Sequence, residues 1–115
     1  MLFIRNVTFM TDDPQRLADF WSAVLALSER RDEAEETICA DRDWHYPRLT
    51  FQKVSDSEER SRRLHLDLTA DDRPAEVQRL RSLGAQEVRD VSMADGWTWT
   101  VMVDPDGNEF CVTDS

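Results

Sequence analysis

The chain has 115 residues, the length of one small domain, and 40% of them are hydrophobic, which is enough for a packed core. Acidic residues dominate its charge, because 24 Asp and Glu stand against 14 Lys and Arg, a formal net charge of −10. A surface this acidic repels phosphate backbones, so we expect no nucleic-acid partner. The acidity is interpreted first as a device for solubility, with a cationic ligand or partner as the alternative.

The sequence carries no signal for export or membrane insertion. No window approaches the roughly 18 apolar residues of a membrane span, and the first residues do not form a basic region followed by an apolar run. The two cysteines, Cys39 and Cys111, match neither a disulfide framework nor a zinc motif. We therefore expect a cytoplasmic protein without membrane contact.

Two stretches half a chain apart share one pattern. Residues 6–13 and residues 65–72 both alternate apolar and polar side chains, both end in Asp-Asp, and both precede a proline, Pro14 or Pro74. The offset between the two stretches is 59 residues. An internal repeat of this kind predicts two copies of one module.

The first module, residues 1–54, opens with such a strand and continues into a helix. Asp13 is the expected N-cap, because its carboxylate can accept from free backbone N–H groups, and proline is tolerated in the first turn. A broad apolar stripe at helical spacing follows, made of Leu17, Phe20, Trp21, Val24 and Leu25. The period then changes to two, which predicts strands over 28–33, 36–40 and 48–54.

A polar, charged linker, residues 55–62, leads to the second module, residues 63–115. Its expected elements are a strand over 63–69, a helix capped by Asp72 and stopped at Gly84, and strands over 86–92, 98–103 and 109–113. The run Asp-Pro-Asp-Gly-Asn at 104–108 predicts a tight turn. The chain is thus expected to be a single α+β domain, 1–115, with the order β-α-β-β-β twice.

Strand periodicity assigns side chains to two faces. Leu64, Leu66 and Leu68 should pack on a helix, and so should Phe51 and Phe110, which are related by the same offset of 59. The opposite, helix-free faces carry Asn6, Gln52, His65 and Cys111. If the two modules curl these faces together, the four side chains meet in one cleft.

Three motifs resemble those of the glyoxalase/bleomycin-resistance/extradiol dioxygenase family, the vicinal oxygen chelate superfamily. They are the helix run at 14–25 with Leu-Ala-Asp-Phe-Trp, the strand Arg-Leu-His-Leu-Asp-Leu at 63–68, and the run from Asp104 to Val112. The resemblance covers essentially the whole chain. It implies two tandem βαβββ modules forming a cup-shaped mixed sheet with helices on the outer face, and a glyoxalase-like domain that commonly forms homodimers.

The resemblance also implies where a metal would bind. His or Glu on the first and last strands of each module hold a divalent cation in the metal-dependent relatives, and the matching positions here hold Asn6, Gln52, His65 and Cys111. Only His65 is a usual ligand, since amides are weak donors and no carboxylate balances the ion's charge. We therefore expect no metal and no cofactor, with a divalent metal as the alternative; Glu109, beside this site, could act as an acid.

The predicted ligand-binding residues line the helix-free faces, with one aromatic at the mouth. His65 and Asp67 lie on one strand face as a polar pair, and Cys111 is interpreted as an inert thiol rather than a nucleophile. Aromatic side chains could wall a planar or cationic ligand. The full set is Asn6, Trp44, Thr50, Gln52, His65, Asp67, Glu109 and Cys111.

The function predicted from the sequence is that of a metal-independent, glyoxalase-like protein that binds a small molecule. It would act either by sequestering a cationic or drug-like ligand or as an enzyme with general acid–base residues. The alternative is a metal-dependent lyase, isomerase or dioxygenase with an atypical site centred on His65. A third interpretation is an interaction module with a vestigial cleft. Whether the chain is an enzyme stays open at this stage, as does the identity of the ligand.

Overall fold

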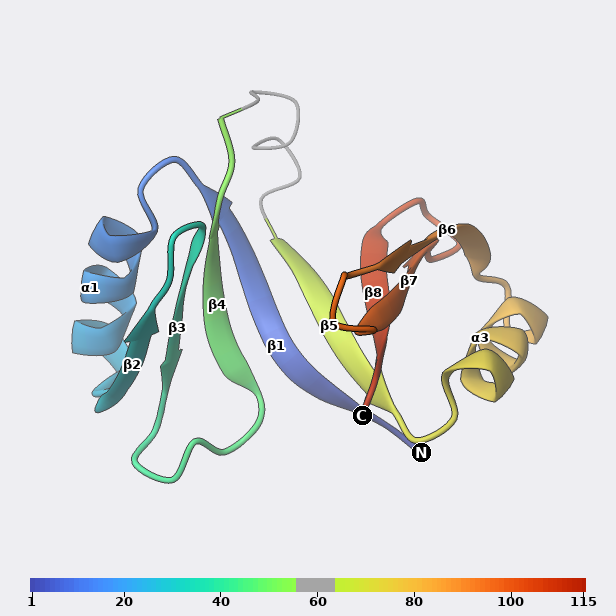
Figure 1. Cartoon of the computed structure of the whole chain (residues 1–115), viewed down its shortest axis with the longest axis horizontal. Helices are drawn as coiled ribbons and strands as arrows, with labels where there is room; N and C mark the ends of the chain where they lie inside the picture. Colours follow the sequence, from blue (N-terminus) through green and yellow to red (C-terminus); the bar gives the residue numbers. More distant parts are fainter. Residues whose placement is uncertain (56–63) are drawn as a thin grey trace. The chain divides into compact units, whose positions relative to one another are not determined.

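The computed structural model describes residues 1–55 and 64–115. Within them the chain forms strands and helices in the order β-α-β-β-β-β-α-β-β-β (Figure 1). This order confirms the predicted α+β fold built from two βαβββ modules. The predicted linker over 55–62 lies, apart from Ser55, outside the described residues.

The observed elements follow the predicted ones closely in their bounds. The first strand extends beyond the repeated stretch 6–13, back to Leu2. The elements are β1 Leu2–Thr11, α1 Pro14–Leu25, β2 Glu29–Asp32, β3 Glu36–Ala40, β4 Arg48–Lys53, β5 Leu64–Ala70, α3 Arg73–Ser82, β6 Gln86–Ser92, β7 Thr98–Val103 and β8 Glu109–Asp114.

Both helices begin as the sequence predicts. The side chain of Asp13 accepts a hydrogen bond from the backbone N–H of Arg16, and that of Asp72 accepts one from Ala75, each at 3.2 Å. Neither helix of the described residues has the length and the apolar character needed to cross a membrane.

The chain divides into two compact units, which we call the α1 unit (residues 6–64) and the α3 unit (residues 1–5 and 65–115). The α1 unit has the strand order β2-β3-β4-β1, and the α3 unit contains β5-β8-β7-β6. In each, one parallel pair, β1 with β4 or β5 with β8, continues into antiparallel neighbours. The first residues of β1 therefore belong with the second module, and Leu2 packs against its core.

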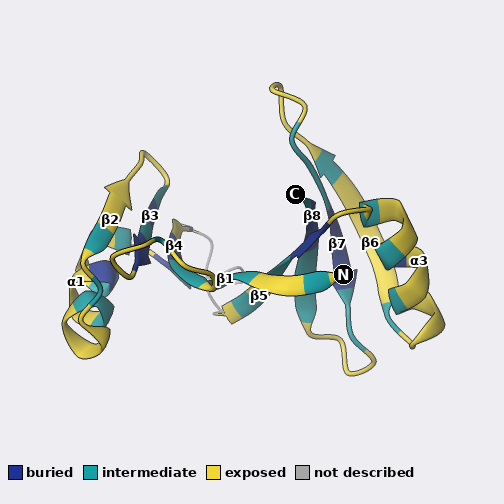
Figure 2. Cartoon of the chain, turned by 90° about the horizontal axis from the view of Figure 1, so that it is seen from below, coloured by how far each residue is buried: buried dark blue, intermediate teal, exposed yellow. Residues whose placement is uncertain are grey.

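Each unit has its own hydrophobic core between its helix and its sheet. Ala18, Cys39 and Phe51 form the centre in the α1 unit. The centre in the α3 unit is formed by Ala70, Val77, Met102 and Val112. Figure 2 shows the buried residues concentrated on the strands beside each helix. The opposite face of each sheet is therefore the one left for polar side chains.

Parts of two predicted apolar faces remain exposed. On α1, Leu17 and Trp21 pack against the core, whereas Phe20, Val24 and Leu25 are each more than half exposed. The predicted stripe is wider than the strip of sheet that the helix covers. On β5, Leu64 and Leu66 are also exposed, because the buried end of this strand is at Thr69 and Ala70.

The two parallel ladders differ in register by two residues. In the first ladder Asn6 lies opposite Arg48, which is 42 residues later in the chain. In the second ladder Leu66 lies opposite Phe110, which is 44 residues later. If β1 and β5 are matched at the offset of 59, the counterpart of Phe51 is therefore Val112, and both are fully buried. The predicted equivalence of Phe51 and Phe110 is wrong, because strand pairing, not constant spacing along the chain, determines which positions correspond.

Candidate functional site

Three side chains on the helix-free face of the α3 unit converge on one point. The ligand atoms of His65, Asp67 and Cys111 all lie within 4.8 Å of one another. His65 Nε2 lies 3.4 Å from Asp67 Oδ1. The side chains of His65 and Asp67 are only 14% and 15% exposed, so the cluster is largely shielded and still reachable.

Two adjacent strands place these three residues. His65 and Asp67 are two positions apart on β5 and so point to the same face. Cys111 is the direct partner of Asp67 in the parallel β5–β8 ladder. The other faces of the same strands carry Ala70 and Val112, which are locked in the core. The packed core therefore holds the backbone under the cluster in place.

The carboxylates of Asp67 and Glu109 make the electrostatic potential at the cluster negative. Burial is the main cause that raises the pKa of the Cys111 thiol, to about 12, and the charge of Asp67, a hydrogen bond to Asp67 and the charge of Glu109 add to it. The charge of Arg89 acts in the opposite direction. Cys111 is thus a neutral thiol near neutral pH, as its interpretation as an inert thiol requires. The carboxylates that disfavour a thiolate would favour a bound cation.

In metal-free protein, Cys111 should be alkylated very slowly at pH 8. A pKa of about 12 instead of 9.0 lowers the thiolate fraction roughly a thousandfold, and the thiolate is the reactive form. Iodoacetamide labelling with a chelator present, followed by peptide mass spectrometry, separates Cys111 from the buried Cys39. Both should react rapidly once urea unfolds the chain, and rapid labelling of native Cys111 would contradict the expectation.

The remaining predicted residue of this unit, Glu109, is half-buried on β8 and close enough to act on Cys111 through its charge. The other four predicted residues, Asn6, Trp44, Thr50 and Gln52, belong to the α1 unit. That they share a cleft with His65 stays a prediction.

The register of β1 and β4 changes which residues of the α1 unit correspond to the cluster. Thr8 lies opposite Thr50, the same relation that Asp67 has to Cys111. Gln52 lies opposite Met10 and is exposed, so it is not the counterpart of Cys111 as we expected. The Thr50 hydroxyl is buried without a hydrogen-bond partner in the described part of the chain, which makes it the polar group with the clearest need for one.

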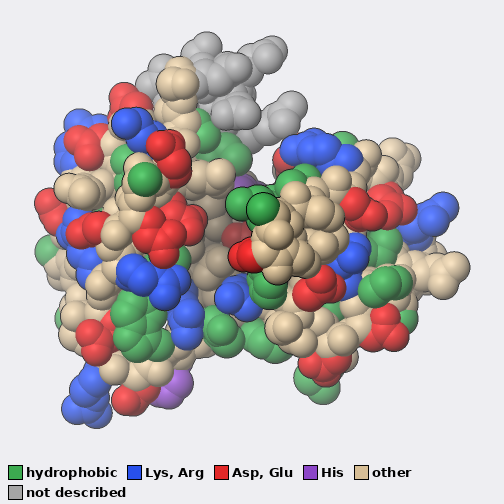
Figure 3. Space-filling view, in the orientation of Figure 1, with side chains coloured by type: hydrophobic (Ala, Val, Ile, Leu, Met, Phe, Trp, Pro, Cys, Tyr) green, Lys and Arg blue, Asp and Glu red, His purple; other side chains and the backbone are tan. Residues whose placement is uncertain are grey.

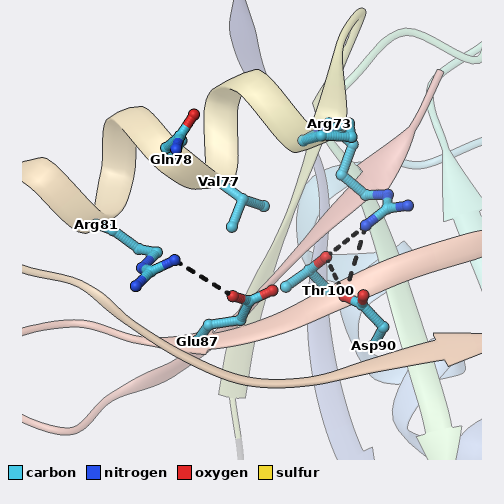
Figure 4. A pocket seen from close by; sticks show the side chains of 8 residues that line it. Arg73, Val77, Gln78, Arg81, Glu87, Asp90 and Thr100 are labelled. Atoms are coloured by element: carbon cyan, nitrogen blue, oxygen red, sulfur yellow. Dashed lines mark hydrogen bonds and ion pairs between the residues drawn. The ribbon is translucent and has the colours of Figure 1, made fainter.

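Sequence reasoning missed one feature, a groove of about 350 Å³ between α3 and the strands β6 and β7 (Figure 4). Arg73 crosses it, donating to Thr100 Oγ1 at 2.7 Å and to Asp114 Oδ1 at 3.0 Å, and Thr100 donates to Asp90. Because these polar groups form hydrogen bonds with one another, we interpret them as groups that hold α3 against the strands rather than as a binding site. Nothing in the local sequence around Arg73 signals strand partners that are 17 to 41 residues away.

Comparisons with solved structures identify the fold. The chain is similar to methylmalonyl-CoA epimerase from Mycobacterium tuberculosis, with a TM-score of 0.70, 15% identity, and coverage of 96% of this chain and 86% of that one. It is also similar to an NAD-dependent benzaldehyde dehydrogenase from Legionella pneumophila, with a TM-score of 0.69, 15% identity, and coverage of 95% and 96%. At this identity the likeness establishes the fold alone.

A hypothetical protein from Bacillus halodurans shows the same likeness, with a TM-score of 0.70, 11% identity, and coverage of 99% of this chain and 94% of that one. No curated protein is significantly similar to the chain in sequence. The fold of these structures agrees with the paired βαβββ modules. The sequence model of the glyoxalase-like domain matches residues 6–113, and the chain belongs to that family.

Proposed function

We propose that the chain binds a divalent transition-metal ion of zinc type through His65, Asp67 and Cys111, and that this ion helps to hold a small molecule on the helix-free face of the α3 unit. The observation that carries the proposal is the convergence of the three donor atoms within 4.8 Å. An imidazole, a carboxylate and a thiolate are the three side-chain types that zinc prefers.

A nearby carboxylate supports the proposal. No carboxylate stood at the positions matched to the family's metal ligands, so the ion's charge had no counterpart. Asp67 supplies that carboxylate from the same strand as His65, and Cys111 lies next to it in the ladder. With a thiolate and a carboxylate as ligands, the charges of the donors balance a divalent ion.

Three protein ligands are the number found in catalytic rather than structural zinc sites. When bound, such an ion supplies a Lewis acid with a position open to water or to an oxygen of a small molecule. The chain's own contribution is the fixed donor set and the nearby carboxylate of Glu109, which could accept or donate a proton. The reaction classes left open by the sequence, lyase, isomerase and dioxygenase, all remain compatible with this site.

Metal-free binding of a small molecule is the second candidate function. Two contacts favour it: the hydrogen bond between Cys111 and Asp67, and the proximity of His65 to Asp67. With these contacts the polar groups of the cluster have partners without any ion. In that case the cluster is a set of hydrogen-bonding groups for an organic ligand.

Metal analysis of protein purified without a tag or chelator tests the proposal. We expect about one ion per chain and a rise in melting temperature on addition of zinc, since a ligand that binds only the folded state stabilises it. Magnesium should have little effect, because it needs several oxygen donors and the cluster offers one carboxylate. Metal far below one ion per chain, with stabilisation only by organic compounds, would favour the metal-free function instead.

A further inference from the structure

The loop between β3 and β4 in the α1 unit is organised by one carboxylate. Asp41 Oδ1 accepts hydrogen bonds from the backbone N–H groups of Asp43 and His45, at 3.1 and 3.0 Å. Its other oxygen lies 2.9 Å from His45 Nδ1. These bonds lower the pKa of Asp41, with the backbone bond from His45 as the largest cause. The loop that carries Trp44 therefore has a defined conformation.

This loop holds Arg48, the first residue of β4, from three directions. The guanidinium carbon lies 4.4 Å from the centre of the Tyr46 ring and 5.3 Å from that of Trp44. Arg48 Nε donates to the backbone oxygen of Trp44 at 3.0 Å. Because guanidinium stacks on aromatic faces, these contacts fix the plane of the side chain.

Among the described residues, Arg48 and the exposed Arg42 have no carboxylate partner, unlike the three other arginines of the unit. Arg16, Arg30 and Arg31 each lie within 4.0 Å of a carboxylate. In the part of the chain that the structure describes, Arg48 has none, although it is half-buried and the chain carries a net charge of −10. The contacts of Arg48 involve Nε and the flat faces of its guanidinium group. The terminal nitrogens Nη1 and Nη2 therefore have no acceptor among the described residues.

We propose that Arg48, held by Trp44 and Tyr46, is a binding site for an oxyanion of a small molecule, a carboxylate or a phosphate group. A guanidinium offers two parallel N–H donors that match the spacing of such oxygens, and a side chain already fixed by stacking loses little freedom on binding. Asn6 is the direct partner of Arg48 across the β1–β4 ladder, so its amide lies on the same face. Figure 3 shows basic and hydrophobic side chains side by side in the lower part of this unit.

The proposed ligand differs from the one that the net charge suggested. Overall acidity favours cations at long range, but salt screens that effect beyond about 10 Å. Direct contact with the stacked guanidinium of Arg48, which has no carboxylate partner among the described residues, then favours an anionic group here. The inference is independent of the metal site, because none of its residues is shared with His65, Asp67 and Cys111.

Titration of the full chain with inorganic phosphate and with acetate, against chloride at equal ionic strength, tests the site. The readout is nitrogen NMR of the Arg48 Nε–H and of the Trp44 indole. We expect both oxyanions to shift these signals and chloride to leave them unchanged. The substitution Arg48→Gln should weaken oxyanion binding by about tenfold or more, the scale expected for charged hydrogen bonds. Arg48→Lys should also weaken it, because a lysine keeps the charge and loses the planar pair of donors.

Arg42→Gln is the matched control, since it removes the same charge from an exposed side chain in the same loop. It should leave oxyanion binding unchanged. Equal weakening by Arg42→Gln, or no response of the unsubstituted chain to either oxyanion, would overturn the proposal. If Arg48→Gln disturbs the fold, as its amide spectrum would show, the comparison of Arg48→Lys with the unsubstituted chain decides instead.

Discussion

Replacing His65 with alanine should lower the affinity for zinc by about a hundredfold or more. Loss of hydrogen bonds to metal ligands alone typically costs ten- to a hundredfold, and here one of three ligands is removed. The remaining donors, Asp67 and Cys111, would then have to bind the ion while the Cys111 thiol gives up its proton against a raised pKa. Calorimetric titration of chelator-treated protein with zinc measures the effect.

The chain offers a matched control for this substitution. His45 is its only other histidine, and it lies exposed in the loop between β3 and β4, paired with Asp41 at 2.9 Å. His45→Ala should leave the zinc affinity of the cluster unchanged. Asp67→Asn, which keeps the shape and removes the charge, should weaken zinc binding as His65→Ala does. Unchanged zinc affinity in both His65→Ala and Asp67→Asn would rule out the cluster as the metal site.

The second large effect is expected in the core of the α1 unit. Phe51 is completely buried, its ring centre lies 5.4 Å from that of Phe9, and it packs against Ala18 on the helix. Phe51→Ala should lower the free energy of unfolding by about 3–5 kcal/mol, because it removes a buried aromatic ring and leaves a cavity. Urea unfolding followed by circular dichroism gives the difference.

Phe110→Ala is the comparison for this substitution. Phe110 is only partly buried at the edge of its core and should cost clearly less, about 1–2 kcal/mol. Equal losses for the two substitutions would contradict the difference in burial between the two rings.

Local chemistry explains why the elements themselves were predictable. The helix over 14–25 needs only an N-capping Asp13, a proline in its first turn and apolar residues at helical spacing, all of which are neighbours in sequence. The turn after Asp104 likewise depends on nearby groups, since this carboxylate accepts from the backbone N–H groups of Asp106 and Asn108, and Gly107 takes a positive φ of 86°. Such interactions form within a short segment of chain and do not depend on the rest of the fold.

The candidate site was predictable only in part, for the same reason. Periodicity placed His65 and Asp67 on one face, because residues two apart on a strand always share a face. It also placed Cys111 on the helix-free side. It could not show that Asp67 and Cys111 are direct partners, or that Gln52 is displaced, since the register of a parallel pair is set by packing of both strands. Nor could periodicity show that the ring of Trp44 contacts Arg48, while its predicted role beside a ligand stays a prediction.

The sequence by itself determined the order of elements, the repeat of one module, the family and the polar character of the helix-free faces. These follow from local propensity and from short-range periodicity. Only the tertiary structure decided the two-residue shift between the ladders, the convergence of His65, Asp67 and Cys111, and the stacking of the Arg48 guanidinium on Tyr46. Each of these depends on contacts between strands or between a loop and a strand, and such contacts come from packing rather than from neighbours in the chain.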